Sequence, residues 1–141
     1  MDASPTPMPG RPVRGSTTGR SLMAALDLFG RRWTLRIIWE LGDGPLGFRS
    51  LQRRCDGMSS SVLRQRLAEL QEVRLAEVSD DGGYALTTLG HEAREALDPL
   101  IDWSQRWAAE LADDAPTAGD GQRDLLSSPL SVMAATDRSW F

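Results

Sequence analysis

Apolar residues recur at helical spacing through the middle of this chain and are sparse near both ends. Apolar side chains three and four positions apart share one face of a helix. On this basis the spacing predicts helices over residues 21–29 and 33–41 and a short helix over residues 48–55. Each of these segments stops at a glycine-containing stretch, as expected where a helix ends.

A fourth helix is predicted to begin after Ser59 and to run to about Val73. The Ser59 hydroxyl is suited to accept a first-turn N–H group, as an N-cap does. Leu63, Leu67 and Leu70 are spaced four and three apart and predict the buried face. The outward face then carries Ser61, Arg64, Gln65 and Ala68.

A β-hairpin and a long helix complete the predicted order of elements. Residues 75–78 and 84–87 are typical of strands, and the acidic, glycine-containing sequence of residues 80–83 between them indicates a tight turn. Thr88 is the predicted start of a helix that continues to about residue 112. The fold class is therefore mainly α with a small β-hairpin, in the element order of a winged helix-turn-helix domain.

The two ends have a different composition from the middle. Residues 1–19 are rich in Pro, Gly, Ser and Thr and predict a disordered N-terminal arm. Residues 20–112 form the predicted domain, and residues 113–141 a flexible C-terminal tail. No stretch has the ~18 consecutive apolar residues of a membrane span, and the N-terminus does not have the pattern of a secretory signal. We therefore expect a cytoplasmic location and no membrane partner.

Charge is divided unevenly along the chain, and all sixteen basic residues are arginine. Residues 1–75 hold 12 arginines and 7 acidic residues, whereas residues 76–141 hold 4 and 13, so that a formal net charge of −4 hides a basic half. A polyanion responds to the field of one face, so DNA remains a candidate partner despite the acidic total. The high arginine content is also explained by a GC-rich genome.

The sequence offers little material for catalysis. Cys55 is the only cysteine and His91 the only histidine, which excludes an internal disulfide and a multi-cysteine zinc site. The chain has no nucleophile–base pairing and no phosphate-binding glycine loop. We expect no enzymatic activity, no cofactor and no metal.

The helix pair at residues 48–55 and 60–73 fits DNA recognition. In a helix-turn-helix the second helix enters the major groove, where Arg64 is suited to guanine and Gln65 to adenine. Five arginines and one acid between residues 49 and 66 suit phosphate neutralisation. From periodicity and charge alone, an ordinary solvated pair of amphipathic helices explains the pattern equally well.

Several motifs in register resemble the HxlR family of bacterial winged helix regulators. The resemblance spans roughly residues 22–107. It includes the segment Ala-Leu-Asp-Leu-Phe-Gly-Arg-Arg-Trp-Thr-Leu at residues 25–35, the segment Val-Leu-x-Gln-Arg-Leu-x-Glu-Leu at residues 62–70, and Trp103. It implies a homodimeric transcriptional regulator, most often a repressor, that binds a palindromic operator. The candidate DNA-binding residues that it implies are Ser60, Ser61, Arg64, Gln65, Arg66, Arg49 and Arg53. The candidate dimer-interface residues are Leu22, Leu26, Trp103 and Trp107.

This chain departs from the family pattern in ways that limit the carry-over. Arg20 stands where many members have a redox-sensing cysteine, so redox sensing at that position is not supported. Asp80 and Asp81 make the predicted wing acidic and unsuited to the minor groove. An alternative function is a winged helix module that has lost DNA affinity and binds a protein or a small molecule. Trp103 and Trp107 are also candidates to line a pocket for a small aromatic effector.

Overall fold

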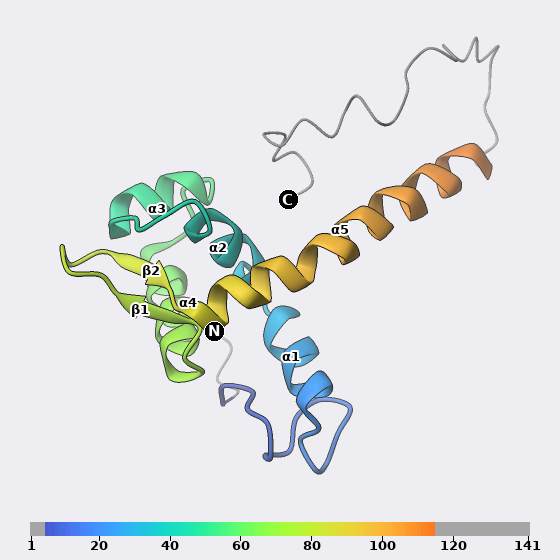
Figure 1. Ribbon diagram of the computed structural model, residues 1–141, viewed down its shortest axis with the longest axis horizontal. Helices are drawn as coiled ribbons and strands as arrows, with labels where there is room; N and C mark the ends of the chain where they lie inside the picture. Colours follow the sequence, from blue (N-terminus) through green and yellow to red (C-terminus); the bar gives the residue numbers. More distant parts are fainter. Residues whose placement is uncertain (1–4, 115–141) are drawn as a thin grey trace, which may run out of the picture. The chain divides into compact units, whose positions relative to one another are not determined.

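The computed structural model describes residues 5–114 of the chain (Figure 1). The described chain divides into two units, one up to residue 98 and one from residue 99 onward. The described elements, in chain order, are the helices and strands α1 (Ser21–Phe29), α2 (Thr34–Leu41), α3 (Phe48–Arg54), α4 (Ser60–Glu72), β1 (Ala76–Val78), β2 (Tyr84–Leu86) and α5 (Thr88–Asp114). The predicted fold class, mainly α with a small hairpin, is confirmed.

The core of the first unit consists of side chains that the apolar spacing predicts to be buried. Its fully buried side chains come from α2, α3 and α4, and include Ile37, Ile38, Leu41, Leu51, Leu63, Leu67 and Leu70. All three leucines expected on the inner face of α4 are at most 1% exposed. The three helices therefore share a single apolar centre, which fixes α4 against α2 and α3.

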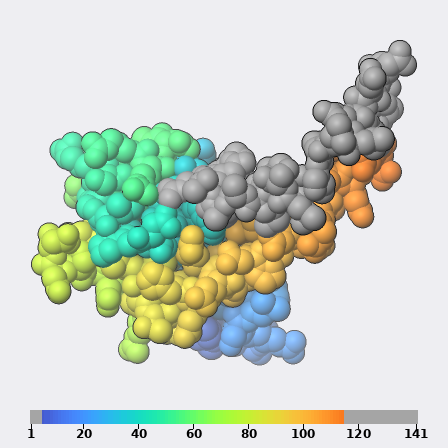
Figure 2. Space-filling view, turned by 45° about the horizontal axis from the view of Figure 1, so that its top comes forward, coloured from blue at the N-terminus to red at the C-terminus, as the bar shows by residue number. Residues whose placement is uncertain are grey.

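The hairpin has the predicted antiparallel pairing and a small addition. Ala76 pairs with Leu86 and Val78 with Tyr84, while Leu46 extends the pairing as an isolated bridge to Tyr84. The Asp81 carboxylate closes the turn by accepting hydrogen bonds from the Ser79 hydroxyl and the Gly83 N–H. The tip of the hairpin projects from the body of the first unit in both views (Figures 1 and 2).

Residues 5–19, whose composition predicts a disordered arm, make backbone hydrogen bonds with one another in this structure. Gly10 donates to the Gly19 carbonyl at 2.8 Å, and Val13 and Ser16 form a two-residue bridge. Gly19 has φ +69°, and a Cβ there would lie 2.2 Å from the Arg11 carbonyl oxygen. The segment is thus a hydrogen-bonded loop that depends on glycine at its closing point.

Helix α5 begins on the first unit and continues into the second. At its start, Gly90 approaches the backbone so closely that a Cβ would lie 2.1 Å from the Leu75 carbonyl oxygen. The Arg94 guanidinium lies 4.1 Å from the centre of the Trp39 ring and 3.9 Å from an Asp43 carboxylate oxygen. Trp39, which falls outside the apolar stripe of α2, is therefore covered by an arginine.

The described part of the second unit is the C-terminal section of α5, from Pro99 to Asp114. Leu100, Trp103, Trp107 and Leu111 are exposed, and Trp103 and Trp107 stack on each other with ring centres 5.5 Å apart. Of the predicted C-terminal tail, residues 113–141, the first two residues belong to α5 and the rest lie outside the described residues.

Candidate nucleic-acid interface

The turn between α3 and α4 is closed by a Schellman motif at the end of α3. Asp56 has a left-handed backbone, with φ 57°, and donates to the Arg53 carbonyl, while Gly57 donates to the Gln52 carbonyl at 2.9 Å. The Gln52 amide in turn donates to the carbonyl of Met58, whose side chain is buried in the core. These contacts fix the direction in which the chain leaves α3 and enters α4.

Helix α4 begins at the predicted N-cap. The Ser59 hydroxyl accepts the Val62 N–H at 3.2 Å, which satisfies one of the first-turn donors that no carbonyl reaches. The Ser59 cap therefore orders the N-terminal end of α4. This is the end of a recognition helix that meets base edges in the helix-turn-helix arrangement.

The exposed face of α4 carries three of the predicted DNA-binding residues. Ser60, Ser61 and Arg64 are exposed, and Gln65 is half-buried. The Arg64 guanidinium lies over the Phe48 ring, 5.1 Å from its centre. Because this cation–π contact holds the side chain near α3 without consuming its hydrogen-bond donors, Arg64 is positioned to bind a base or a phosphate.

Helix α3 adds two exposed arginines to this surface. Arg49 and Arg53 are both exposed, and Arg53 donates to the Ser50 hydroxyl at 3.3 Å. With Arg64 they give α3 and α4 a basic surface, the chemistry needed to neutralise phosphates. We call Ser60, Ser61, Arg64, Arg49 and Arg53 the basic surface of the helix pair.

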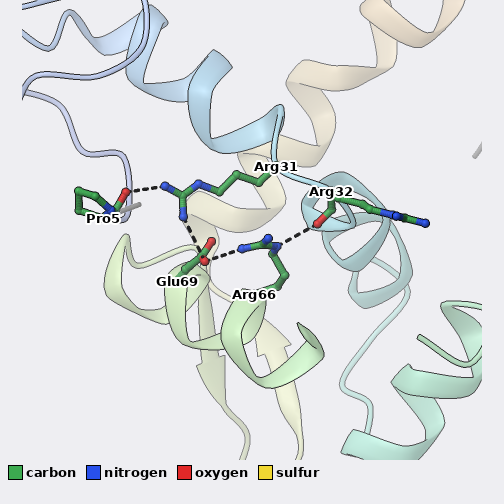
Figure 3. A network of polar contacts seen from close by, with 5 residues as sticks. All are labelled: Pro5, Arg31, Arg32, Arg66 and Glu69. Atoms are coloured by element: carbon green, nitrogen blue, oxygen red, sulfur yellow. Dashed lines mark hydrogen bonds and ion pairs between the residues drawn. The ribbon is translucent and has the colours of Figure 1, made fainter. Parts of the chain in front are cut away.

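Arg66, also predicted to bind DNA, does not belong to this surface because its side chain is buried, and its role in DNA binding stays a prediction. Its side chain is buried, with its Nη1 2.6 Å from Glu69 Oε1 and its Nε donating to the Arg32 carbonyl at 2.9 Å (Figure 3). Arg31 Nη1 lies 3.1 Å from the same carboxylate oxygen. A buried guanidinium needs such partners, so Arg66 ties α4 to the connection between α1 and α2.

A second buried carboxylate connects α2 to α3. Glu40 on α2 is 1% exposed, and its oxygens lie 3.1 Å from Arg36 Nε and 3.7 Å from Arg54 Nη1. Arg36 also donates to the Arg54 carbonyl at 2.8 Å. Sequence reasoning missed this network, although the i,i+4 spacing of Arg36 and Glu40 was a usable signal.

The predicted dimer-interface residues are exposed apolar side chains in this chain. Leu22 and Leu26 on α1 are 69% and 52% exposed, and Trp103 and Trp107 on α5 are 49% and 53% exposed. Their role in an interface stays a prediction. Burying large apolar side chains that a single chain leaves in water would stabilise an assembly.

Neither Cys55 nor His91 is placed for chemistry. Cys55 is fully buried, and burial raises the pKa of its thiol from 9.0 to about 11, so that the reactive thiolate is suppressed. His91 is exposed in the first turn of α5. Among residues 5–114, no three His, Cys, Asp or Glu side chains are grouped as a metal site requires. No described helix is long and apolar enough to cross a membrane.

The helix pair, its basic surface and the hairpin define a winged helix-turn-helix domain of the DNA-binding class. The model of the HxlR-like helix-turn-helix family matches residues 28–112, and the chain belongs to this family. The family resemblance inferred from the sequence is confirmed, and the chain is placed among transcriptional regulators.

Relatives of this chain are described as regulators of transcription. The HTH-type transcriptional regulator YodB of Bacillus subtilis is 27% identical over 112 residues, covering 77% of this chain and 99% of YodB. An HTH-type regulator of Methanocaldococcus jannaschii, whose function is uncharacterised, is 29% identical over 89 residues, which cover 60% of this chain and 83% of that protein.

Solved structures give the same assignment. The crystal structure of quinone-bound YodB from B. subtilis has a TM-score of 0.53 and 31% identity, covering 63% of this chain and 96% of that one. A structure from Thermoplasma volcanium, described as that of a possible HxlR family transcriptional factor, also has a TM-score of 0.53 and 31% identity, covering 60% and 82% of the two chains.

Proposed function

We propose that this protein is a homodimeric repressor that binds a palindromic operator through α4 and that acts in the cytoplasm. The observation that carries the proposal is the exposure of Arg64 on α4, with Arg49 and Arg53 beside it on α3. An arginine side chain makes a bidentate contact with guanine, and exposed arginines on the preceding helix suit phosphates.

The homodimer is supported by apolar surface on both helices that flank the DNA-binding elements. Leu22 and Leu26 on α1 and Trp103 and Trp107 on α5 are all about half exposed or more. A two-fold dimer presents two copies of α4 to one duplex. Its half-sites would then be centred one helical turn apart, about 10 bp, or a multiple of that distance.

Control by a small molecule is part of the proposal. It is supported by the relative YodB, whose crystal structure is that of a quinone-bound protein. An aromatic effector between Trp103 and Trp107 requires a different arrangement of the two rings, since they are stacked on each other within 10° of parallel.

Selection of bound sequences from random duplex DNA tests the proposal. The full chain is expected to enrich a two-fold symmetric motif, and Arg64→Ala is expected to lose preference at one position of each half-site. Arg20→Ala, which changes an exposed arginine before α1, is the control. Enrichment of no motif, together with no retention on heparin at low salt, would favour the alternative of a winged helix module without DNA affinity.

A further inference from the structure

A hollow with a volume of about 810 Å³ lies between the N-terminal loop, α1 and α4. Residues 5–7 and 11–14 form one wall, the C-terminal end of α1 another, and Arg66 of α4 reaches it from a third side. The volume is within the range of about 300–1,000 Å³ that small-molecule sites occupy. None of the residues of the basic surface of the helix pair lines this hollow.

The lining is strongly cationic. Five of its side chains are arginines, namely Arg11, Arg14, Arg31, Arg32 and Arg66. Among the described lining residues Asp27 is the one carboxylate, and it accepts the Arg14 backbone N–H at 3.3 Å. Behind the wall Arg31 and Arg66 share the single oxygen Glu69 Oε1 (Figure 3). The chemistry that such a lining binds is an anion.

The rest of the lining is largely apolar and includes three prolines. Pro5, Pro7, Pro12, Val13 and Leu26 line the hollow between the arginines. An inorganic anion would leave these surfaces in water, whereas an organic anion with a flat apolar body would cover them. A carboxylate also matches the paired N–H groups of a guanidinium.

The wall formed by the N-terminal loop is fixed in place by contacts with the rest of the unit. Arg31 donates to the Pro5 carbonyl, and the Arg20 N–H donates to the Ser16 hydroxyl at 3.1 Å. Gly10 and Gly19 close the loop through a backbone hydrogen bond. Because the walls are already ordered, a ligand would pay little entropy to organise them.

The hollow is connected to α4 through Arg66. This side chain lines the hollow and at the same time binds Glu69 one turn further along α4 and the Arg32 carbonyl before α2. A ligand carboxylate that binds Arg31 or Arg66 competes with Glu69 for their N–H groups. Occupancy therefore changes the contacts that hold the middle of α4 in position.

We propose that this hollow binds an organic monocarboxylate with a flat apolar body, and that binding lowers the affinity of the protein for DNA. The ligand class follows from the arginines and prolines of the lining, and the effect on DNA follows from Arg66. The second half of the proposal rests on the proposed function, whereas the first half does not.

Calorimetric titration of the full chain without DNA tests the site. The probe is 2-naphthoate, and the neutral amide 2-naphthamide and acetate are matched for shape and for charge respectively. We expect one 2-naphthoate per chain, bound at least tenfold more tightly than either control, since a charge-assisted pair is lost in the amide and the apolar contact is lost in acetate. Equal binding of 2-naphthoate and 2-naphthamide, or no saturable binding, would overturn the proposal.

Variants of exposed arginines locate the site without disturbing the core. Arg11 and Arg14 line the hollow and are exposed, so the double variant R11Q/R14Q is expected to fold and to bind 2-naphthoate at least fivefold more weakly. Arg20, an exposed arginine of the same segment outside the hollow, provides the control R20Q, which is expected to bind as the parent does. Equal weakening in both variants would show a general charge effect and contradict the site.

A DNA-binding titration separates the two halves of the proposal. With a selected duplex, saturating 2-naphthoate is expected to weaken binding at least fivefold, the lower end of usual coupling between sites. Unchanged duplex affinity with bound ligand would overturn the link through Arg66. If R11Q/R14Q weakens duplex binding while 2-naphthoate does not bind, the two arginines contact DNA and the ligand site is refuted. Absence of duplex binding in every sample would refute the proposed function and leave the calorimetric result standing.

Discussion

Arg64 and Arg66 are two residues apart on α4, yet one lies exposed over the Phe48 ring and the other is buried against Glu69. The helical period separates them, because two residues correspond to about 200° around the axis. Their chemistry is the same, but their roles are expected to differ: Arg64 is free to meet a ligand of α4, while Arg66 holds the helix in place.

Removing each arginine in turn should therefore affect different properties. Arg66→Ala removes a buried side chain together with its contact to Glu69 and its hydrogen bond to the Arg32 carbonyl, and is expected to cost about 2 kcal/mol of unfolding free energy or more although Arg31 still pairs with Glu69. Arg64→Ala removes an exposed side chain and is expected to change stability by no more than about 0.5 kcal/mol. Chemical denaturation monitored by tryptophan fluorescence measures both. Equal losses in the two variants would contradict the assignment.

Single alanine variants also distinguish the DNA-binding roles expected of Arg64 and Arg49. Arg64→Ala is expected to cost about 1–3 kcal/mol on the preferred duplex and much less on a mutated one, because it removes base recognition. Arg49→Ala on α3 is expected to weaken all duplexes about equally and to reduce the salt dependence by about one ion, as a phosphate contact does. Gel-shift titrations at several salt concentrations distinguish these patterns. Uniform weakening by Arg64→Ala would remove it from base recognition.

The helix cap at Ser59 offers a local test of α4. Ser59→Ala removes the hydroxyl that accepts the Val62 N–H and is expected to cost about 1 kcal/mol of unfolding free energy. Ser60→Ala, at the next position, is the matched control, since no described contact of the Ser60 hydroxyl supports the helix. Thermal unfolding of both variants measures the difference. If Ser60→Ala were the more destabilising change, the cap would be misassigned.

The buried thiol predicts a specific dependence of stability on pH. Burial raises the pKa of the Cys55 thiol from 9.0 to about 11 in the folded chain. Above pH 9 the unfolded thiol releases its proton while the folded one retains it, so the free energy of unfolding is expected to fall as the pH rises from 9 to 11. The chain has no lysine and one tyrosine, so few other groups titrate in this interval.

Two measurements check the thiol. Cys55→Ala is expected to lose less stability between pH 9 and pH 11 than the parent chain does. A thiol reagent at pH 8 is expected to react slowly with the native chain and fast with the chain in denaturant, because the thiolate is the nucleophile. Fast reaction in the native chain would show that Cys55 is accessible.

Much of this fold was predictable because its helices are short and amphipathic. The spacing of Leu63, Leu67 and Leu70 gave the inner face of α4, and the hydroxyl of Ser59 gave its start. The same spacing also placed Arg66 on the inner face, three residues after Leu63 and four before Leu70. The prediction of Arg66 as a DNA contact followed the family motif instead of this periodicity, and the structure places its side chain in the interior.

The N-terminal loop was not predictable from composition. Its order depends on two contacts: Gly19 closely approaches the Arg11 backbone, and Arg31 donates a hydrogen bond to the Pro5 carbonyl. The first contact requires a residue without a side chain, and the second joins positions that are far apart in the sequence. A proline- and glycine-rich segment has the composition of disorder whether or not such contacts form. The cationic hollow beside it was missed for the same reason, because its arginines come from three separate segments.

The exposed apolar stripe of α5 leads to a prediction about assembly. Four large side chains recur at spacings of three, four and four residues, and each is about half exposed: Leu100, Trp103, Trp107 and Leu111. A stripe of this kind is the pattern of a helix that meets another helix. Replacing both tryptophans by glutamate (W103E/W107E) places charges on this stripe and is expected to convert a dimer into a monomer.

Light scattering coupled to gel filtration measures the mass of W103E/W107E against the parent chain. The matched control is Val78→Glu, because Val78 is 60% exposed on β1 and lies outside the proposed interface. The parent and the control are expected to have twice the mass of the chain, and the tryptophan variant once. Since a palindrome is read by two linked copies of α4, the same variant is expected to lose most of its affinity for a two-fold duplex while keeping its unfolding temperature. A dimeric W103E/W107E would remove α5 from the interface, and a monomeric parent chain would remove the two-fold operator from the proposed function.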